Sequence, residues 1–185
     1  KDSNTNFDAQ RYTGTGASKA ITTGFQPDMV WGKQRNGSSS NCVMDVVRGL
    51  SSTLKTNSDA AVEAASDVIT AWDSDGFTLG TSATGPNMNI NTNTFVAYSW
   101  KGGGTGVANT TGSLDSTVSA NTTSGFSVVK FTGDNSAAST VGHGLSSAPD
   151  MILVKQMTDA STDWCVYFNT DNAGNGKALI LNTTA

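Results

Sequence analysis

The sequence predicts an all-β protein: an antiparallel β-sandwich of lectin-like or jelly-roll type, built from an internal repeat whose second copy is incomplete. Strand-favouring Thr, Val and aromatic residues are frequent, whereas glutamate occurs once, at Glu63. The 20 glycines lie among many Ser, Thr and Asn residues, so the chain turns often. Short apolar runs follow these turns, and two sets of runs match each other. Long helical bundles are therefore not expected.

The repeat relates the stretch that begins at Phe7 to the one that begins at Phe126. "FDAQRYTG" matches "FSVVKFTG" at an offset of 119 residues, and "PDMVWGKQ" matches "PDMILVKQ" at an offset of 122. Cys42 and Cys165 continue the match at an offset of 123. The offset changes by only a few residues, which indicates small insertions in surface turns. In both copies the first strand carries aromatics at its first and sixth positions, an odd spacing that predicts an irregularity.

We divide the chain into copy one, residues 1–108, and copy two, residues 109–185. Copy one contains a polar excursion at 51–70 and a Gly-rich segment, "KGGGTG" at 101–106, which predicts a flexible joint. Within the excursion, "SDAAVEAASDVI" is the only stretch that could form a helix. The alternative is an extended loop over a sheet.

Copy two has no counterpart of "GFTLG" and "NTFVAYSW", two strand-like runs of copy one. A sheet without them would expose unpaired edges. Three arrangements would solve this: the natural chain continues beyond Ala185, a neighbouring subunit donates strands, or the two copies interleave into one sandwich.

Charge and hydropathy exclude two classes of partner. Charged residues make up 14% of the chain, the formal net charge is −4 and the sequence pI is about 4.7. No cluster of Lys or Arg could follow a phosphate backbone, and no apolar run approaches the length of a membrane span. We therefore expect neither nucleic-acid binding nor membrane insertion.

The residues with catalytic potential do not form a recognisable motif. His143, the only histidine, lies between two glycines, and a threonine takes its place in copy one, which is typical of a turn residue. An acid pair such as Asp28 and Asp45 could serve glycoside hydrolysis, but a chain with one Glu makes the usual arrangement improbable. We expect no enzymatic activity.

Metal and thiol chemistry have few candidates. Asp73 and Asp75 precede a glycine turn and could begin a Ca²⁺ or Mg²⁺ site, although an Asx turn is the ordinary explanation. No other cofactor is expected. The chain has too few Cys and His residues for a zinc site. Cys42 and Cys165 could form a disulfide, but we expect two small apolar side chains in matching core positions.

Aromatic side chains are the candidates for ligand binding. Trp31, Tyr98, Trp100 and Trp164, together with Tyr167, could form a platform on which sugar rings stack. Because they lie in strand-like runs, packing in the core or against another subunit is the alternative.

The ordered blocks "VRGLS", "SDGFTLG", "TFVAYSWKGGG", "ANTTSGFSVVKFTG" and "VGHGLSSAPDMILVK" carry a family resemblance. Over nearly the whole chain, the sequence resembles a repeated domain of unknown function in structural proteins of marine tailed bacteriophages, cyanophages especially. There the domain occurs in tail-fibre-like proteins. The resemblance implies a β-sandwich and brings no established catalytic or binding residues.

The resemblance implies a non-enzymatic, extracellular virion module of a tail fibre or another phage appendage that contributes to host-surface attachment. The expected partners are other virion proteins, copies of the chain itself in a trimer, and host-surface glycans. The alternative is a carbohydrate-binding module of a secreted or surface protein.

Overall fold

The computed structural model describes residues 5–81, 86–168 and 179–183, which form antiparallel sheets and no α-helix. The prediction of an all-β, sandwich-like fold is confirmed. The candidate helix of the polar excursion does not form: part of it is a short strand. Within these ranges, no helix could cross a membrane. The strands are β1 (Phe7–Thr13), β2 (Lys19–Thr22), β3 (Met29–Gln34), β4 (Cys42–Asp45), β5 (Ser52–Lys55), β6 (Glu63–Ala64), β7 (Ile69–Asp73), β8 (Gly76–Leu79), β9 (Thr94–Trp100), β10 (Val107–Asn109), β11 (Ser116–Asn121), β12 (Phe126–Phe131), β13 (Met151–Val154), β14 (Cys165–Phe168) and β15 (Leu179–Ile180).

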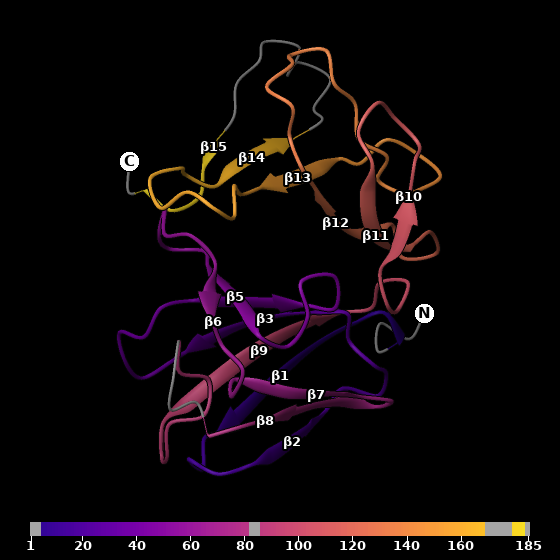
Figure 1. Ribbon diagram of the computed structural model, residues 1–185. Helices are drawn as coiled ribbons and strands as arrows, with labels where there is room; N and C mark the ends of the chain where they lie inside the picture. Colours follow the sequence, from indigo (N-terminus) through magenta and orange to yellow (C-terminus); the bar gives the residue numbers. More distant parts are fainter. Residues whose placement is uncertain (1–4, 82–85, 169–178, 184–185) are drawn as a thin grey trace.

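Copy one is a two-layer sandwich. Its larger sheet has the strand order β1-β9-β3-β4-β5-β6, and its smaller sheet has the order β2-β8-β7 (Figure 1). Strand β9, the last of copy one, inserts between β1 and β3 and pairs antiparallel with both. The first and third strands of the copy are therefore joined only through its last strand.

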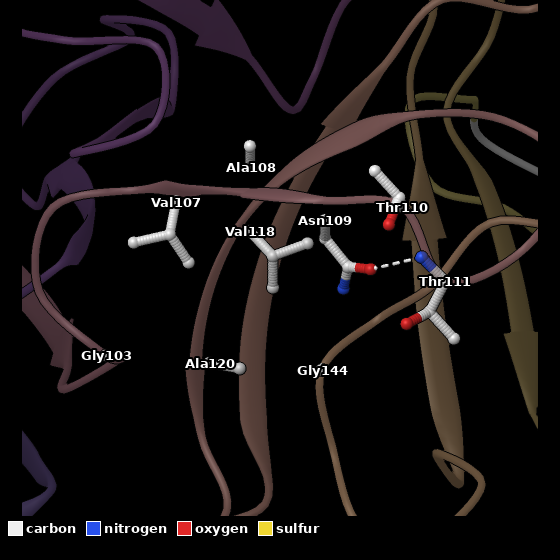
Figure 2. A pocket seen from close by; sticks show the side chains of 9 residues that line it. All are labelled: Gly103, Val107, Ala108, Asn109, Thr110, Thr111, Val118, Ala120 and Gly144. Atoms are coloured by element: carbon white, nitrogen blue, oxygen red, sulfur yellow. Dashed lines mark hydrogen bonds between the residues drawn. The ribbon is translucent and has the colours of Figure 1, made fainter.

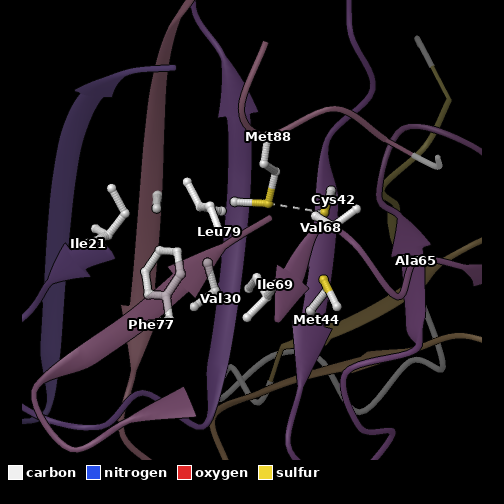
Figure 3. Packing of buried hydrophobic residues seen from close by; sticks show 11 residues of the cluster. Ile21, Val30, Cys42, Met44, Ala65, Val68, Ile69, Phe77, Leu79 and Met88 are labelled. Carbon is white, nitrogen blue, oxygen red and sulfur yellow. Dashed lines mark hydrogen bonds between the residues drawn. The ribbon is translucent and has the colours of Figure 1, made fainter. Parts of the chain in front are cut away.

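The core lies between these two sheets, where every second side chain of a strand points inward. Figure 3 shows this cluster, in which side chains from both sheets meet around Phe77. Full burial of one such large apolar side chain contributes roughly 1.5–3 kcal/mol. The cluster comprises Ile21, Val30, Cys42, Met44, Ala65, Val68, Ile69, Phe77, Leu79, Met88 and Ala97.

Strand β1 does not carry the predicted irregularity. Its register with β9 runs unbroken from Phe7 opposite Trp100 to Thr13 opposite Thr94. The odd spacing instead places the two aromatics of β1 on opposite faces. Phe7 lies against Trp100, with ring centroids 5.1 Å apart, while Tyr12 points inward and donates a hydrogen bond to the Met88 carbonyl at 2.8 Å.

Copy two forms two small sheets, β10-β11-β12 and β13-β14-β15, and the first of these includes β10, which crosses the boundary between the copies. The second repeats the pairing of β3-β4-β5: Cys42 pairs with Lys55, and the matching Cys165 pairs with Ile180. In the described part of the chain, no strand that begins after residue 109 enters either sheet of the copy-one sandwich. The copies make contact, and the indole N–H of Trp164 donates to the Lys55 carbonyl at 2.8 Å.

The Gly-rich joint differs from the flexible segment that its composition predicts. The amide of Gly104 donates to the buried Asp28 carboxylate at 3.1 Å, and the amide of Gly103 donates to Ser119 Oγ at 3.0 Å. The Ser119 hydroxyl in turn donates to the Gly104 carbonyl at 2.7 Å. These bonds tie the joint to both copies, so it sets their relative position.

Gly103→Ala is expected to weaken this joint. A Cβ at Gly103 would overlap backbone atoms of Ala120, which cannot move without disturbing β11. We expect a loss of about 1–3 kcal/mol in the free energy of unfolding, measured by denaturant titration. The control is Gly133→Ala, where a Cβ meets no atom within 4 Å. Equal stability of Gly103→Ala and the control would contradict the tight joint.

High pH is expected to destabilise the core of copy one. Burial raises the pKa of the Cys42 thiol from 9.0 to about 11, and burial also raises the pKa of Tyr12. The folded chain therefore keeps a Cys42 proton that the unfolded chain releases above about pH 9. The contribution of this thiol to the free energy of unfolding is fully present below about pH 9. It falls by about 2 kcal/mol as the pH rises to about 11. Denaturant unfolding at pH 8–11 tests this, and Cys42→Ala should show a shallower pH dependence.

Candidate functional site

Three of the four aromatic candidates lie together on the larger sheet of copy one. Trp31 of β3 lies opposite Tyr98 of β9, and the Tyr98 and Trp100 rings have centroids 6.4 Å apart. They alternate along the strands with buried residues such as Ala97, so they occupy the face that points away from the core. The Tyr98 side chain is 39% exposed. This aromatic row consists of Trp31, Tyr98 and Trp100.

The aromatic row has polar and apolar neighbours. Arg11 and Lys33 both lie opposite Val96, two residues along β9 from Tyr98, and supply cations beside the rings. A hollow of about 540 Å³ follows β1 and is lined by residues 9–13, Arg35 and Thr94. At the other end of the row, Phe126 of copy two stacks on Trp100 with centroids 6.0 Å apart. The row could therefore bind a flat, polar-edged ligand or carry contacts between the two copies.

The structure does not place Trp164 and Tyr167 in the aromatic row. Trp164 precedes β14 and is buried at the contact between the copies, where it bonds to Lys55. Tyr167 lies on β14 and is exposed. The predicted platform of all these aromatics therefore does not form.

A second hollow, of about 410 Å³, lies beside β10 and β11 in copy two (Figure 2). Its side chains are small, and within it the Thr111 amide donates to Asn109 Oδ1 at 2.7 Å. Its lining residues carry no charged side chain. The lining residues are Gly103, Val107, Ala108, Asn109, Thr110, Thr111, Val118, Ala120 and Gly144.

The candidate metal residues lie at the hairpin between β7 and β8. The Asp73 carboxylate accepts a hydrogen bond from the Thr78 hydroxyl at 2.7 Å. The Asp75 carbonyl accepts the amides of Thr23 and Gly24 at 2.8 and 3.0 Å. No group of three or more His, Cys, Asp or Glu side chains gathers anywhere in residues 5–81, 86–168 and 179–183. These contacts give Asp73 and Asp75 a role in the turn.

The candidate catalytic residues have structural partners. His143 Nδ1 accepts the Leu145 amide at 3.1 Å, as expected for a turn residue. Asp28 accepts the Gly104 amide at the joint. Asp45 accepts the amides of Val47 and Arg48 at 3.0 and 2.8 Å, and its other oxygen pairs with Arg48 Nε at 2.6 Å.

Only one cysteine occupies the predicted core position. Cys42 is buried and Cys165 is exposed, and both are free thiols. The prediction of two buried cysteines is therefore wrong for Cys165. In copy one, β7 and β8 cover the face of the sheet that contains Cys42; no described strand of copy two takes their place.

A surface that the sequence did not predict extends from Cys165. Ile152, Val154 and Tyr167 are 40%, 45% and 40% exposed, whereas Val30 and Met44, which match the first and third of these, are fully buried. We call the face of β13-β14 that contains Ile152, Val154, Cys165 and Tyr167 the open face. It has the composition of a core surface, and none of the strands in the described ranges forms a second layer over it. The absence of "GFTLG" from copy two was the available signal, but it predicted only free strand edges.

Comparison with protein families assigns both copies of the repeat to a single family domain. A family model described as "Domain of unknown function (DUF7483)" matches residues 2–185. The chain belongs to this family. The DUF7483 model covers both copies, so the closed copy and the copy with the open face fall within one family domain. No curated protein and no solved structure matches the chain.

Proposed function

We propose that this chain is a non-enzymatic structural module of an extracellular assembly, namely a phage tail fibre or another virion appendage, where it contributes to host attachment. The proposed partners are other virion proteins and further copies of the chain in a trimer. The open face of copy two supports this proposal most directly, because contiguous apolar surface of this kind is typical of sites where proteins associate.

The free strand edges support the same proposal. Among the described residues, β12 pairs with β11 alone and β13 with β14 alone. Such edges offer unpaired amides and carbonyls to a partner strand. Copy one, by contrast, has a closed core that would keep the module folded on the outside of a particle.

Assembly is the test. Light scattering of the 185-residue chain should show a trimer, and labelled chain should bind appendages or particles of the phage that encodes it. A monomer that binds no virion component would contradict the proposal.

A second candidate function is carbohydrate binding, favoured by the exposed Tyr98 ring between Trp31 and Trp100 with Arg11 and Lys33 nearby. Rings with cationic neighbours suit acidic or neutral glycans. Glycan-array binding that Tyr98→Ala abolishes would support this function. Tyr167→Ala, at an equally exposed tyrosine of copy two, is the matched control. Absence of glycan binding at high protein concentration would remove this candidate.

A further inference from the structure

We propose that copy two is a docking site for a polypeptide segment with the β7–β8–β9 pattern of residues 69–100, which adds one strand between β12 and β13 and covers the open face. Copy one of the same chain supplies the template for both contacts. This inference deepens the proposed assembly function and rests on it for its biological role.

Copy one can serve as a template for copy two because equivalent residues pair with each other in both copies. In β13-β14-β15, the residues that pair on either side of the central strand β14 are the repeat equivalents of those that pair on either side of β4 in β3-β4-β5. The matched pairs are Val30–Met44 with Ile152–Tyr167, Trp31–Val43 with Leu153–Val166, Gly32–Cys42 with Val154–Cys165, and Cys42–Lys55 with Cys165–Ile180. A segment that fits one sheet therefore meets equivalent positions in the other.

Among the described strands, copy two has no counterpart of β9. In copy one, β9 separates β1 from β3 and pairs with each along its length. Strand β12 matches β1 and strand β13 matches β3, but no described strand joins them. Among the described strands, β12 pairs only with β11 and β13 only with β14, so each keeps one free edge. At β13 this free edge corresponds to the edge of β3 that pairs with β9 in copy one.

No described strand forms a second layer over the open face. In copy one, the face of Val30, Cys42 and Met44 is covered by Ile69 of β7 and by Phe77 of β8, all within one buried cluster. The open face presents matching residues without that cover. Sheets with one apolar face bury it against a second layer. A β7–β8 hairpin would supply this layer.

The opposite face of the same sheet is covered in part by copy one. Val166 and Trp164 alternate with the residues of the open face and are buried, and Trp164 bonds to Lys55 of copy one. Met151 and Phe168, which pair with each other on that opposite face, remain 47% and 40% exposed, so the cover does not extend along the whole sheet.

The neighbouring charges define the chemistry of the inserted strand. In copy one, Val96 of β9 lies between Arg11 and Lys33. The matching residues of copy two are Lys130 and Lys155. The residue at the place of Val96 must then be uncharged or acidic, because a third cation in this row would be repelled. The inward positions require small or apolar side chains, like the fully buried Phe95, Ala97 and Ser99 of β9.

The experiment extends the 185-residue chain and uses Cys165 as a reporter. A second copy of residues 61–108 is added after Ala185, which preserves the spacing because Lys55 and Ile180 are equivalent. We expect maleimide labelling of Cys165 to slow by about tenfold or more, because the thiol would react only after local opening. Buried Cys42 provides the internal reference for a covered thiol. The added segment contains no cysteine.

The matched control carries Phe77→Asp and Phe95→Asp within the added segment only, which should leave Cys165 as reactive as in the original chain. A second measurement does not depend on the folding of the extension. A peptide with the sequence of residues 93–100 is mixed with the original chain, and amide hydrogen exchange of β12 and β13 should slow on binding.

Other outcomes would overturn the inference. Unchanged Cys165 labelling in the extended chain, together with unchanged exchange in β12 and β13, would show that the segment does not dock. Protection of Cys165 in the original chain that rises with protein concentration would assign the open face to a second copy. If the added segment protects Cys165 but the chain binds no virion component, the docking inference stands and the proposed function is wrong. If the chain binds virion components but the added segment does not protect Cys165, the proposed function stands and the docking inference is wrong.

Discussion

Asp45→Ala is expected to cost about 3–5 kcal/mol in the free energy of unfolding, because it leaves the buried Arg48 guanidinium without its counter-charge. The two side chains are almost inaccessible, and Arg48 Nε lies 2.6 Å from Asp45 Oδ2. Arg48 Nη2 also donates to the Val43 carbonyl at 2.9 Å, so the guanidinium cannot turn to solvent without breaking a second bond. Denaturant unfolding measures the loss.

The double variant Asp45→Ala with Arg48→Met separates the charge from the packing. Removing both charges should recover much of the stability, since an apolar pair of similar volume avoids the desolvation of an unpaired ion. A double variant as unstable as Asp45→Ala alone would show that the Asp45 bonds to the Val47 and Arg48 amides are the main contribution.

Trp164→Ala is expected to release copy two from copy one at a cost of about 3–5 kcal/mol, the usual loss for a large buried aromatic. The variant removes both the ring at the contact and the bond from Nε1 to the Lys55 carbonyl. Circular dichroism and denaturant titration should show an early transition for copy two, followed by unfolding of copy one at an unchanged midpoint.

The control is Trp164→Phe, which keeps an aromatic ring but cannot donate to Lys55. We expect it to lose about 1 kcal/mol, the contribution of one hydrogen bond, and to retain a single transition. A single transition in Trp164→Ala as well would mean that the joint at 101–106 is enough to keep the copies together.

The strands of the sandwich could be predicted wherever local pattern and tertiary role agree. The runs "MVWGKQ" and "MILVKQ" become β3 and β13, and the repeat offset anticipates their shared register. The polar excursion was harder, because Ser52–Lys55 has little apolar character. It forms β5 through pairing with β4, where the buried Thr53 hydroxyl donates to the Val43 carbonyl at 3.2 Å. Hydrogen bonds to a strand that is distant in the sequence therefore determine that these residues form β5.

The candidate site was predictable only in part, for a similar reason. Strand alternation groups Tyr98 with Trp100, and pairing with β3 adds Trp31. Sequence could not separate Cys42 from Cys165, because both lie in similar strands and differ only in the layer above them. Nor could composition show that the Gly-rich joint is held by Asp28 and Ser119. These properties depend on residues distant in the sequence.

All four residues of β4 are buried: Cys42 and Met44 point into the core of copy one, while Val43 lies on the opposite face of the strand. This strand is therefore covered on both faces, whereas β13 and β14 have one exposed face and an opposite face that is covered only in part. Under mechanical tension, β13 and β14 should therefore separate before β4 does. Copy two is then expected to open first under load while copy one keeps its fold.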